Sequence, residues 1–180
     1  QKDTMQDITH IPVDVIHSFM IDTFEALGTP EEDARICAEV LIESDLRGIE
    51  SHGVGRLKYY YDRIEMGLHR TVTEMEIVKE TETTAVIDGH HGMGMVIARR
   101  SMEMAIEKAR VHGLGMVTVR NSTHYGYAAH YPLMAVEADM IGMTGTKPDE
   151  DIRLPMQWTS DDANVGFTTG VPWRAPAADY

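Results

Sequence analysis

Apolar and polar positions follow a helical period over the first quarter of the chain. In residues 9–28 apolar side chains return every three or four positions and a glycine ends the run, which is typical of an amphipathic helix. A second helix is predicted from Thr29 to about Leu46, with Thr29 as the N-cap. Pro30 then takes the first helical position, and Glu32 completes a capping box.

From residue 54 the pattern alternates between helical and extended stretches. A third helix is predicted over residues 54–67. Residues 71–88 are expected to be extended, because "TTAVIDG" near their end is typical of a strand that leads into a turn. The remaining elements follow in this order: a helix at residues 95–113, a buried strand at residues 114–121, a helix at residues 126–139 and a short strand at residues 140–145. This order favours a helical N-terminal segment followed by an α/β unit.

The composition of the chain changes after residue 146. Both tryptophans and four of the seven prolines lie beyond it, whereas twelve of the thirteen methionines lie before it. The stretch that follows shows neither a helical nor an alternating period, and so long an irregular segment is uncommon inside a compact domain. We therefore expect three regions: a helical region at residues 1–70, an α/β region at residues 71–146 and an irregular tail at residues 147–180.

Charge and cysteine content narrow the class of protein. The formal net charge of −13 argues against nucleic acid and against an anionic membrane surface, because both are bound through lysine and arginine. Cys37 is the only cysteine, which excludes an internal disulfide and a cysteine zinc site and fits a reducing compartment. No apolar run approaches the length of a membrane span. The sequence predicts a soluble, cytoplasmic protein with no nucleic-acid or membrane partner.

The motif "NSTHYGY", residues 121–127, is the first candidate for chemistry. It follows a predicted strand and precedes a predicted helix, which is where α/β proteins place their ligands. His124 lies at its centre, and a histidine can give and take a proton near neutral pH. The alternative interpretation is a hydrogen-bonded structural histidine in a turn.

The second candidate is "SDLRGIESHGVGR", residues 44–56, which lies between two predicted helices. Its arginines offer planar forks of N–H donors that match a carboxylate. His52 and Arg56 are four residues apart and would share one face of a helix. Together they could hold a 2-oxo acid, with Arg56 on the carboxylate and His52 on the carbonyl. The alternative is a solvated, charged loop.

The third motif, "DGHHGMGM" at residues 88–95, is rich in glycine but lacks the full dinucleotide-binding fingerprint. We interpret it as a tight turn that starts a helix, with His90 and His91 exposed. A metal site on this histidine pair has no third ligand indicated.

Three stretches resemble the malate/L-lactate dehydrogenase family, which also contains ureidoglycolate, sulfolactate and diketogulonate dehydrogenases. They are "ESDLRGIESHGVGRLKYYYDRI", "VIDGHHGMGM" and "VTVRNSTHYGYAAHY". The resemblance covers residues 7–146. It implies an NAD- or NADP-dependent hydride transfer between nicotinamide and a 2-oxo or 2-hydroxy acid. It also implies a homodimer, and a non-Rossmann, largely antiparallel cofactor-binding sheet flanked by helices.

The same resemblance assigns roles to individual residues. His124 would be the proton donor or acceptor, and His52 would be a second active-site histidine and a rival for that role. Arg56 would orient the substrate carboxylate, and Thr144 and Thr146 would lie near the cofactor. The expected fold class is α/β: an N-terminal helical segment, a partial non-Rossmann nicotinamide-binding unit and a loop-rich C-terminal tail. No metal is expected.

The tail resembles a different family, the α-glucosidases of glycoside hydrolase family 13, in "RLPMQW" and "NVGFTTGVPW". This predicts a chimera joined within residues 141–146. The tail carries no recognisable pair of catalytic carboxylates, so hydrolysis is not expected. Two alternatives to a dehydrogenase follow: a catalytically inactive scaffold, or a weak carbohydrate-binding element that uses Trp158 and Trp173.

Overall fold

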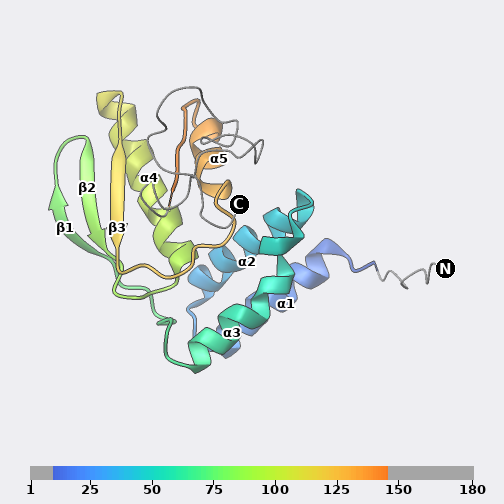
Figure 1. Cartoon of the computed structure of the whole chain (residues 1–180). Coiled ribbons are helices and arrows are strands. Elements are labelled where there is room, and N and C mark those ends of the chain that lie inside the picture. Colours follow the sequence, from blue (N-terminus) through green and yellow to red (C-terminus); the bar gives the residue numbers. More distant parts are fainter. Residues whose placement is uncertain (1–9, 146–180) are drawn as a thin grey trace, which may run out of the picture. The chain divides into compact units, whose positions relative to one another are not determined.

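The computed structural model describes residues 10–145, which form three N-terminal helices followed by a small sheet with two further helices (Figure 1). The elements are α1 (Val13–Ala26), α2 (Glu31–Leu46), the 3₁₀ turns η1 (Glu50–His52) and η2 (Val54–Arg56), α3 (Leu57–Glu65), β1 (Glu76–Glu80), β2 (Thr84–Asp88), α4 (Gly94–His112), β3 (Met116–Arg120) and α5 (His130–Glu137). The coarse α/β prediction is confirmed. None of these helices is both long and apolar enough to cross a membrane.

The helical part is held together by apolar side chains that α1, α2 and α3 direct into one core. Its fully buried members include Met20 and Phe24 of α1, Cys37 and Leu41 of α2, and Tyr60 of α3. Helix α2 also packs against α4, so this core continues to the start of the sheet-bearing part. The packing fixes α3, and with it Tyr60, relative to the loops that follow the strands.

If Thr29 were the N-cap, α2 would begin at Pro30, but it begins one residue later, at Glu31. Its N-cap is Pro30, and no side chain caps the helix. The Thr29 N–H donates to the Phe24 carbonyl at the end of α1. The Thr29 side chain is buried, and its hydroxyl has no hydrogen-bond partner among residues 10–145. The predicted capping box is therefore wrong, because Thr29 serves to close the preceding helix instead.

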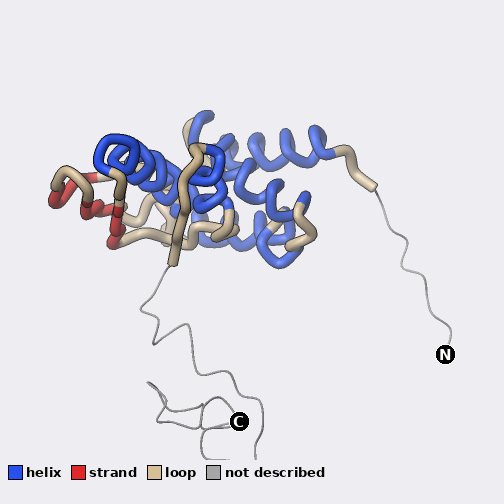
Figure 2. The backbone as a smooth tube through the Cα atoms, turned by 90° about the horizontal axis from the view of Figure 1, so that it is seen from above, coloured by secondary structure: helices blue, strands red, loops and turns tan. Residues whose placement is uncertain are grey.

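The sheet has the order β1-β2-β3. Strands β1 and β2 are antiparallel, with an irregularity between Ile77 and Lys79, and β2 and β3 are parallel. The parallel pair needs a crossover, and α4 supplies it. Figure 2 shows the strands gathered along one side of α4. The described part of the sheet is thus mixed in direction, and the largely antiparallel sheet implied by the resemblance stays a prediction.

Two strand predictions differ from the structure. Strand β3 was expected to be buried, yet its residues alternate between exposed and half-buried, and all of β1 is exposed. Residues 140–145 form no strand, and Ile141 and Met143 are 95% and 87% exposed. Strands are stabilised by hydrogen bonds to a neighbour. The outer edge of β3 has no neighbour within the described residues, but this segment lies against α5 instead, where the Met140 N–H donates to the Ala135 carbonyl.

Candidate active site

His52 and His124 come together although they lie on distant segments. Their rings are stacked, with centroids 6.0 Å apart and an interplanar angle of 19°. The ring of Tyr59 touches His124 edge-on at 5.5 Å, and the Arg56 guanidinium lies over the same Tyr59 ring at 5.7 Å. The structure therefore brings three of the five predicted site residues together: His124 and Arg56 contact the Tyr59 ring, and His52 stacks on His124.

The loop that carries His52 and Arg56 is built from two 3₁₀ turns rather than from the expected first turns of a helix. The Asp45 carboxylate accepts a hydrogen bond from the Val54 N–H at 2.7 Å and fixes the second turn. A Cβ on Gly53 would lie 1.7 Å from Asp45 Oδ1, so a larger residue would displace the carboxylate that fixes this turn. Arg56 Nε donates to the Ser51 carbonyl at 2.7 Å, which ties the arginine to the histidine turn.

The loop that carries His124 is clamped against the start of α4. The Gly94 N–H donates to Thr123 Oγ1 at 2.9 Å, and the Thr123 hydroxyl donates to the Gly92 carbonyl at 2.8 Å. A Cβ on Gly94 would lie 2.3 Å from the Thr123 carbonyl oxygen. The glycine-rich motif is thus a turn and helix start that supports the site, as predicted. His91 is exposed as expected, and His90 is half-buried.

His124 is held in one tautomer by two contacts to Nδ1. The Gly126 N–H donates to Nδ1 at 3.2 Å, and the hydroxyl of Tyr60 lies 2.8 Å from the same atom. A backbone N–H can only donate, so Nδ1 accepts and the proton of the neutral imidazole is on Nε2. Burial raises the pKa of the Tyr60 hydroxyl, which therefore stays protonated and can donate to Nδ1.

The electrostatic environment keeps His124 neutral at pH 7. Desolvation of the half-buried ring lowers its pKa, and the nearby charges of His52, Arg56 and Arg63 lower it further. Arg56 forms no ion pair with a carboxylate among the described residues. A guanidinium beside a histidine that has no carboxylate partner within the described residues can use its remaining N–H donors for the carboxylate of a ligand.

Four residues of this site did not stand out in the sequence. Tyr59 and Tyr60 have ring centroids 5.4 Å apart, and both contact His124. Arg63 lies over Tyr59 at 4.5 Å, and the buried His69 packs against Tyr60 at 5.9 Å. Arg56, Tyr60 and Arg63 recur at steps of three to four residues on α3 and its cap. This spacing in "RLKYYYDR" is a signal that could have revealed Arg63, but it does not single out Tyr60 among three successive tyrosines, and His69 lies outside the stretch.

The residues expected to contact the cofactor are not part of this cluster. Thr144 is exposed, on a segment without regular structure, and Thr146 lies outside the described residues. The side chains that do converge are imidazoles, arginines and tyrosines, which suit an acid with an oxygen to be protonated. The residues of this cluster do not by themselves fit a nicotinamide cofactor. The contacts predicted for the two threonines stay predictions.

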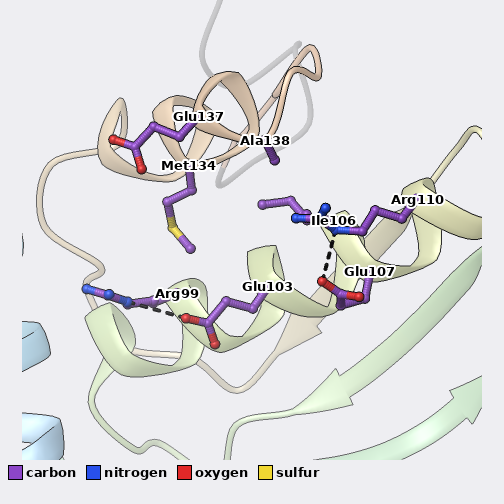
Figure 3. A pocket seen from close by; sticks show the side chains of 8 residues that line it. All are labelled: Arg99, Glu103, Ile106, Glu107, Arg110, Met134, Glu137 and Ala138. Atoms are coloured by element: carbon purple, nitrogen blue, oxygen red, sulfur yellow. Dashed lines mark hydrogen bonds and ion pairs between the residues drawn. The ribbon is translucent and has the colours of Figure 1, made fainter.

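A shallow cleft of about 320 Å³ lies elsewhere, between α4 and α5 (Figure 3). Its floor includes Ile106 and Met134. Its charged side chains pair with one another, Arg99 with Glu103 and Arg110 with Glu107. Since its arginines are already neutralised and no histidine lines it, the His52–His124 cluster is the better candidate for chemistry.

The chain thus has an α/β architecture and a cluster in which an imidazole lies close to an arginine. Comparison with known families identifies the family. The family model for malate/L-lactate dehydrogenase matches residues 11–167, and the chain belongs to this family. The match extends past residue 146, where the sequence predicts a change to a glucosidase-like segment. That resemblance and the chimera stay predictions for residues outside the described part.

Individual relatives support the assignment. The chain is 49% identical over 145 residues to malate dehydrogenase of Pyrococcus abyssi, covering 79% of this chain and 40% of that protein. It is 43% identical over 130 residues to L-sulfolactate dehydrogenase of Methanocaldococcus jannaschii, covering 72% and 38%. The structure of malate dehydrogenase from Pyrococcus horikoshii matches with a TM-score of 0.72 at 44% identity, covering 77% of this chain and 40% of that one. The chain thus spans about 40% of the length of such relatives.

Proposed function

We propose that this chain provides the substrate-binding and proton-transfer residues of an NAD- or NADP-dependent dehydrogenase of 2-hydroxy acids. The observation that carries the proposal is the pairing of Tyr60 with His124 beside a stacked His52 and an unpaired Arg56. Its partner is a small 2-oxo or 2-hydroxy acid. The names of the relatives, malate, sulfolactate and hydroxycarboxylate dehydrogenases, support the same class of substrate.

In this proposal Arg56 binds the substrate carboxylate and His124 exchanges a proton with the oxygen on the neighbouring carbon. During reduction of a 2-oxo acid, protonated His124 donates its Nε2 proton to that oxygen and becomes neutral with its remaining proton on Nδ1. In the protonated ring and in this product, Nδ1 donates to the Tyr60 hydroxyl and gives up the 3.2 Å contact with the Gly126 N–H. A hydroxyl can either donate or accept, so Tyr60 can hold Nδ1 before and after the transfer. The bound cofactor would supply or accept the hydride.

The binding of an anionic substrate should itself favour the protonated form of His124. The positive charges of Arg56 and Arg63 contribute to the low pKa of this histidine. A carboxylate placed next to Arg56 offsets part of that charge, because an opposite charge within a few ångströms favours the charged form of a titratable group. Proton uptake is therefore coupled to substrate binding, and the proton is present when the 2-oxo group arrives.

The finer features implied by the resemblance belong to the same proposal. They are a homodimer, a non-Rossmann cofactor sheet completed by further family segments, and a cytoplasmic location, which the single cysteine and the acidic composition support. The alternative is a scaffold that keeps the histidine cluster but lacks turnover. It is supported by the composition change that predicts a chimera.

Binding of a 2-hydroxy acid tests the proposal without requiring turnover. L-2-hydroxybutyrate is titrated into the folded chain while the imidazole resonances of His124 are followed by NMR. We expect a saturable shift in the wild-type chain and a loss of binding in Arg56→Gln. The proposal would be overturned by a folded sample in which the His124 resonances do not shift when the acid is added. Fluorescence titration with NADH and NADPH then distinguishes the proposed dehydrogenase from the scaffold without turnover. Binding of a cofactor supports the dehydrogenase, and the absence of cofactor binding supports the scaffold.

A further inference from the structure

Most arginines in the described part of the chain form an ion pair with a carboxylate, and a few of them do not. The paired ones are Arg35, Arg47, Arg99, Arg100, Arg110 and Arg120. Within residues 10–145, Arg56, Arg63 and Arg70 form no such pair. The chain has 29 acidic and 16 basic residues, so carboxylates are not scarce. Two of the three unpaired guanidinium groups lie in the candidate active site.

Arg63 is placed to act together with Arg56. Both guanidinium groups lie over the ring of Tyr59, at 4.5 Å for Arg63 and 5.7 Å for Arg56. The two arginines are seven residues apart, which is about two turns of a helix, so they project from the same side of α3 and its cap. The Tyr59 ring in turn contacts His124 at 5.5 Å. Two positive groups thus flank one ring next to the acid-base histidine.

Arg63 can bind an anion even though its guanidinium group also contacts the Tyr59 ring. A cation over an aromatic ring is attracted by the ring face. The five N–H donors of a guanidinium lie in its own plane and point outward, so they remain able to bind an anion. The half-buried position of Arg63 reduces competition from water compared with a fully exposed arginine.

We propose that Arg63 is a specificity-determining residue that binds a second anionic group of the substrate. On the basis of the proposed function, Arg56 holds the carboxylate next to the reacting carbon and Arg63 holds the group at the other end. The site then prefers dianionic 2-oxo and 2-hydroxy acids, whose second group is a carboxylate or a sulfonate. Monoanionic acids still bind through Arg56, but more weakly.

Two acids of equal carbon number provide the test. L-malate and L-2-hydroxybutyrate share the carboxylate and the 2-hydroxyl, and they differ by a second carboxylate in place of a methyl group. Dissociation constants for both are measured from the His124 resonances in the wild-type chain, Arg63→Gln and Arg63→Lys. Arg70→Gln is the matched control, because it removes the same charge from an exposed arginine outside the cluster. Cooperative thermal unfolding confirms that each variant is folded.

We expect the wild-type chain and Arg70→Gln to bind L-malate about tenfold or more tightly than L-2-hydroxybutyrate, as a charge-assisted hydrogen bond would give. Arg63→Gln should abolish this preference, because L-malate loses about tenfold or more affinity relative to the smaller loss for L-2-hydroxybutyrate. Arg63→Lys should restore part of it, because the charge remains but the planar fork is lost.

The outcomes separate this inference from the proposed function. Equal binding of both acids by the wild-type chain, or an unchanged preference in Arg63→Gln, overturns the role of Arg63 and leaves the 2-hydroxy acid site standing. An equal loss of both affinities in Arg63→Gln also overturns it, because the residue would then only support the cluster. Failure of the folded wild-type chain to bind either acid overturns both proposals.

Discussion

Tyr60 and His124 are 64 residues apart in the chain, yet the Tyr60 hydroxyl lies 2.8 Å from Nδ1 of His124. Tyr60 is fully buried in the core formed by α1, α2 and α3, whereas His124 belongs to the loop after β3. The contact therefore connects the helical core to the sheet-bearing part at the site of chemistry. It also makes the protonation state of His124 depend on how α3 is packed.

Replacing Tyr60 by phenylalanine should change the titration of His124. The ring still fills its buried position, but Nδ1 keeps only its 3.2 Å contact with the Gly126 N–H. We expect the free energy of unfolding to fall by about 1 kcal/mol, as is usual for one lost hydrogen bond, and the pKa of His124 to shift. NMR titration of the imidazole and chemical denaturation give the two quantities.

Tyr131→Phe is the control for that experiment. Tyr131 is also buried, and its hydroxyl donates to the Tyr125 carbonyl. Its removal should cost a similar amount of stability without affecting the titration of His124. If both variants changed the titration equally, the effect of Tyr60→Phe would reflect loosened packing rather than its hydrogen bond.

Loss of positive charge around Tyr59 should raise the pKa of His124. Desolvation is the largest cause of its low value, and His52, Arg56 and Arg63 add to it. Both Arg56→Gln and Arg63→Gln should therefore shift the titration of His124 upward, towards the ordinary range, when followed by NMR. Arg70→Gln should leave it in place. An unchanged midpoint in both site variants would mean that the arginines do not influence this histidine.

Stability should decline as the pH falls from about 6.5 to about 4, chiefly because of His69. Burial, followed by the charges of Arg63 and His124, lowers the pKa of His69 to about 4 from an ordinary value of 6.5. The unfolded chain therefore binds a proton in this window that the folded chain does not. The stabilisation is complete above pH 6.5 and is lost as the pH falls, by an amount on the order of 2–3 kcal/mol.

His69→Phe is the variant that tests the role of His69 between pH 6.5 and pH 4, because it keeps an aromatic ring of similar shape against Tyr60. Urea denaturation between pH 7 and pH 4 should show a shallower decline in the variant, by up to about one proton in the pH slope. Asp88, whose pKa is lowered to about 2 by hydrogen bonds from His90 and other groups, affects stability only at lower pH. Identical slopes in the two proteins would exclude His69 as the cause.

The sequence predicted those elements whose signals are local. The helix predicted to end at residue 113 does end there, because Gly113 follows α4 in a left-handed conformation with φ of 78°. The capping box at Thr29 is wrong because the Thr29 N–H closes the preceding helix. The strand predicted at residues 140–145 is wrong because that segment lies against α5 and pairs with none of the described strands. Arg56 and His124 were found because their motifs are distinctive.

Tyr60 could not be singled out from the run "YYY" in the same way. Periodicity places all three tyrosines on a helix, but only the tertiary packing of α3 decides which of them reaches His124. The same applies to His69, since its burial against Tyr60 depends on how the segment after α3 turns back. Short-range sequence patterns predict helices, strands and motifs. Contacts between segments that are distant in the chain can be recognised only when the fold is known.

Gly94→Ala should destabilise the protein even though alanine is the better helix former. A Cβ at this position would lie 2.3 Å from the Thr123 carbonyl oxygen and 2.5 Å from that of His124, and both are backbone atoms. The clash forces the His124 loop away from α4, at a cost of about 1–3 kcal/mol, the range seen for overpacking. Gly55→Ala is the matched control, because its new Cβ would meet only the Glu50 carbonyl oxygen at 3.9 Å. Thermal unfolding together with the His124 resonances measures both effects. If Gly94→Ala were as stable as Gly55→Ala and left those resonances unmoved, the clamp between α4 and the His124 loop would not be what positions the histidine.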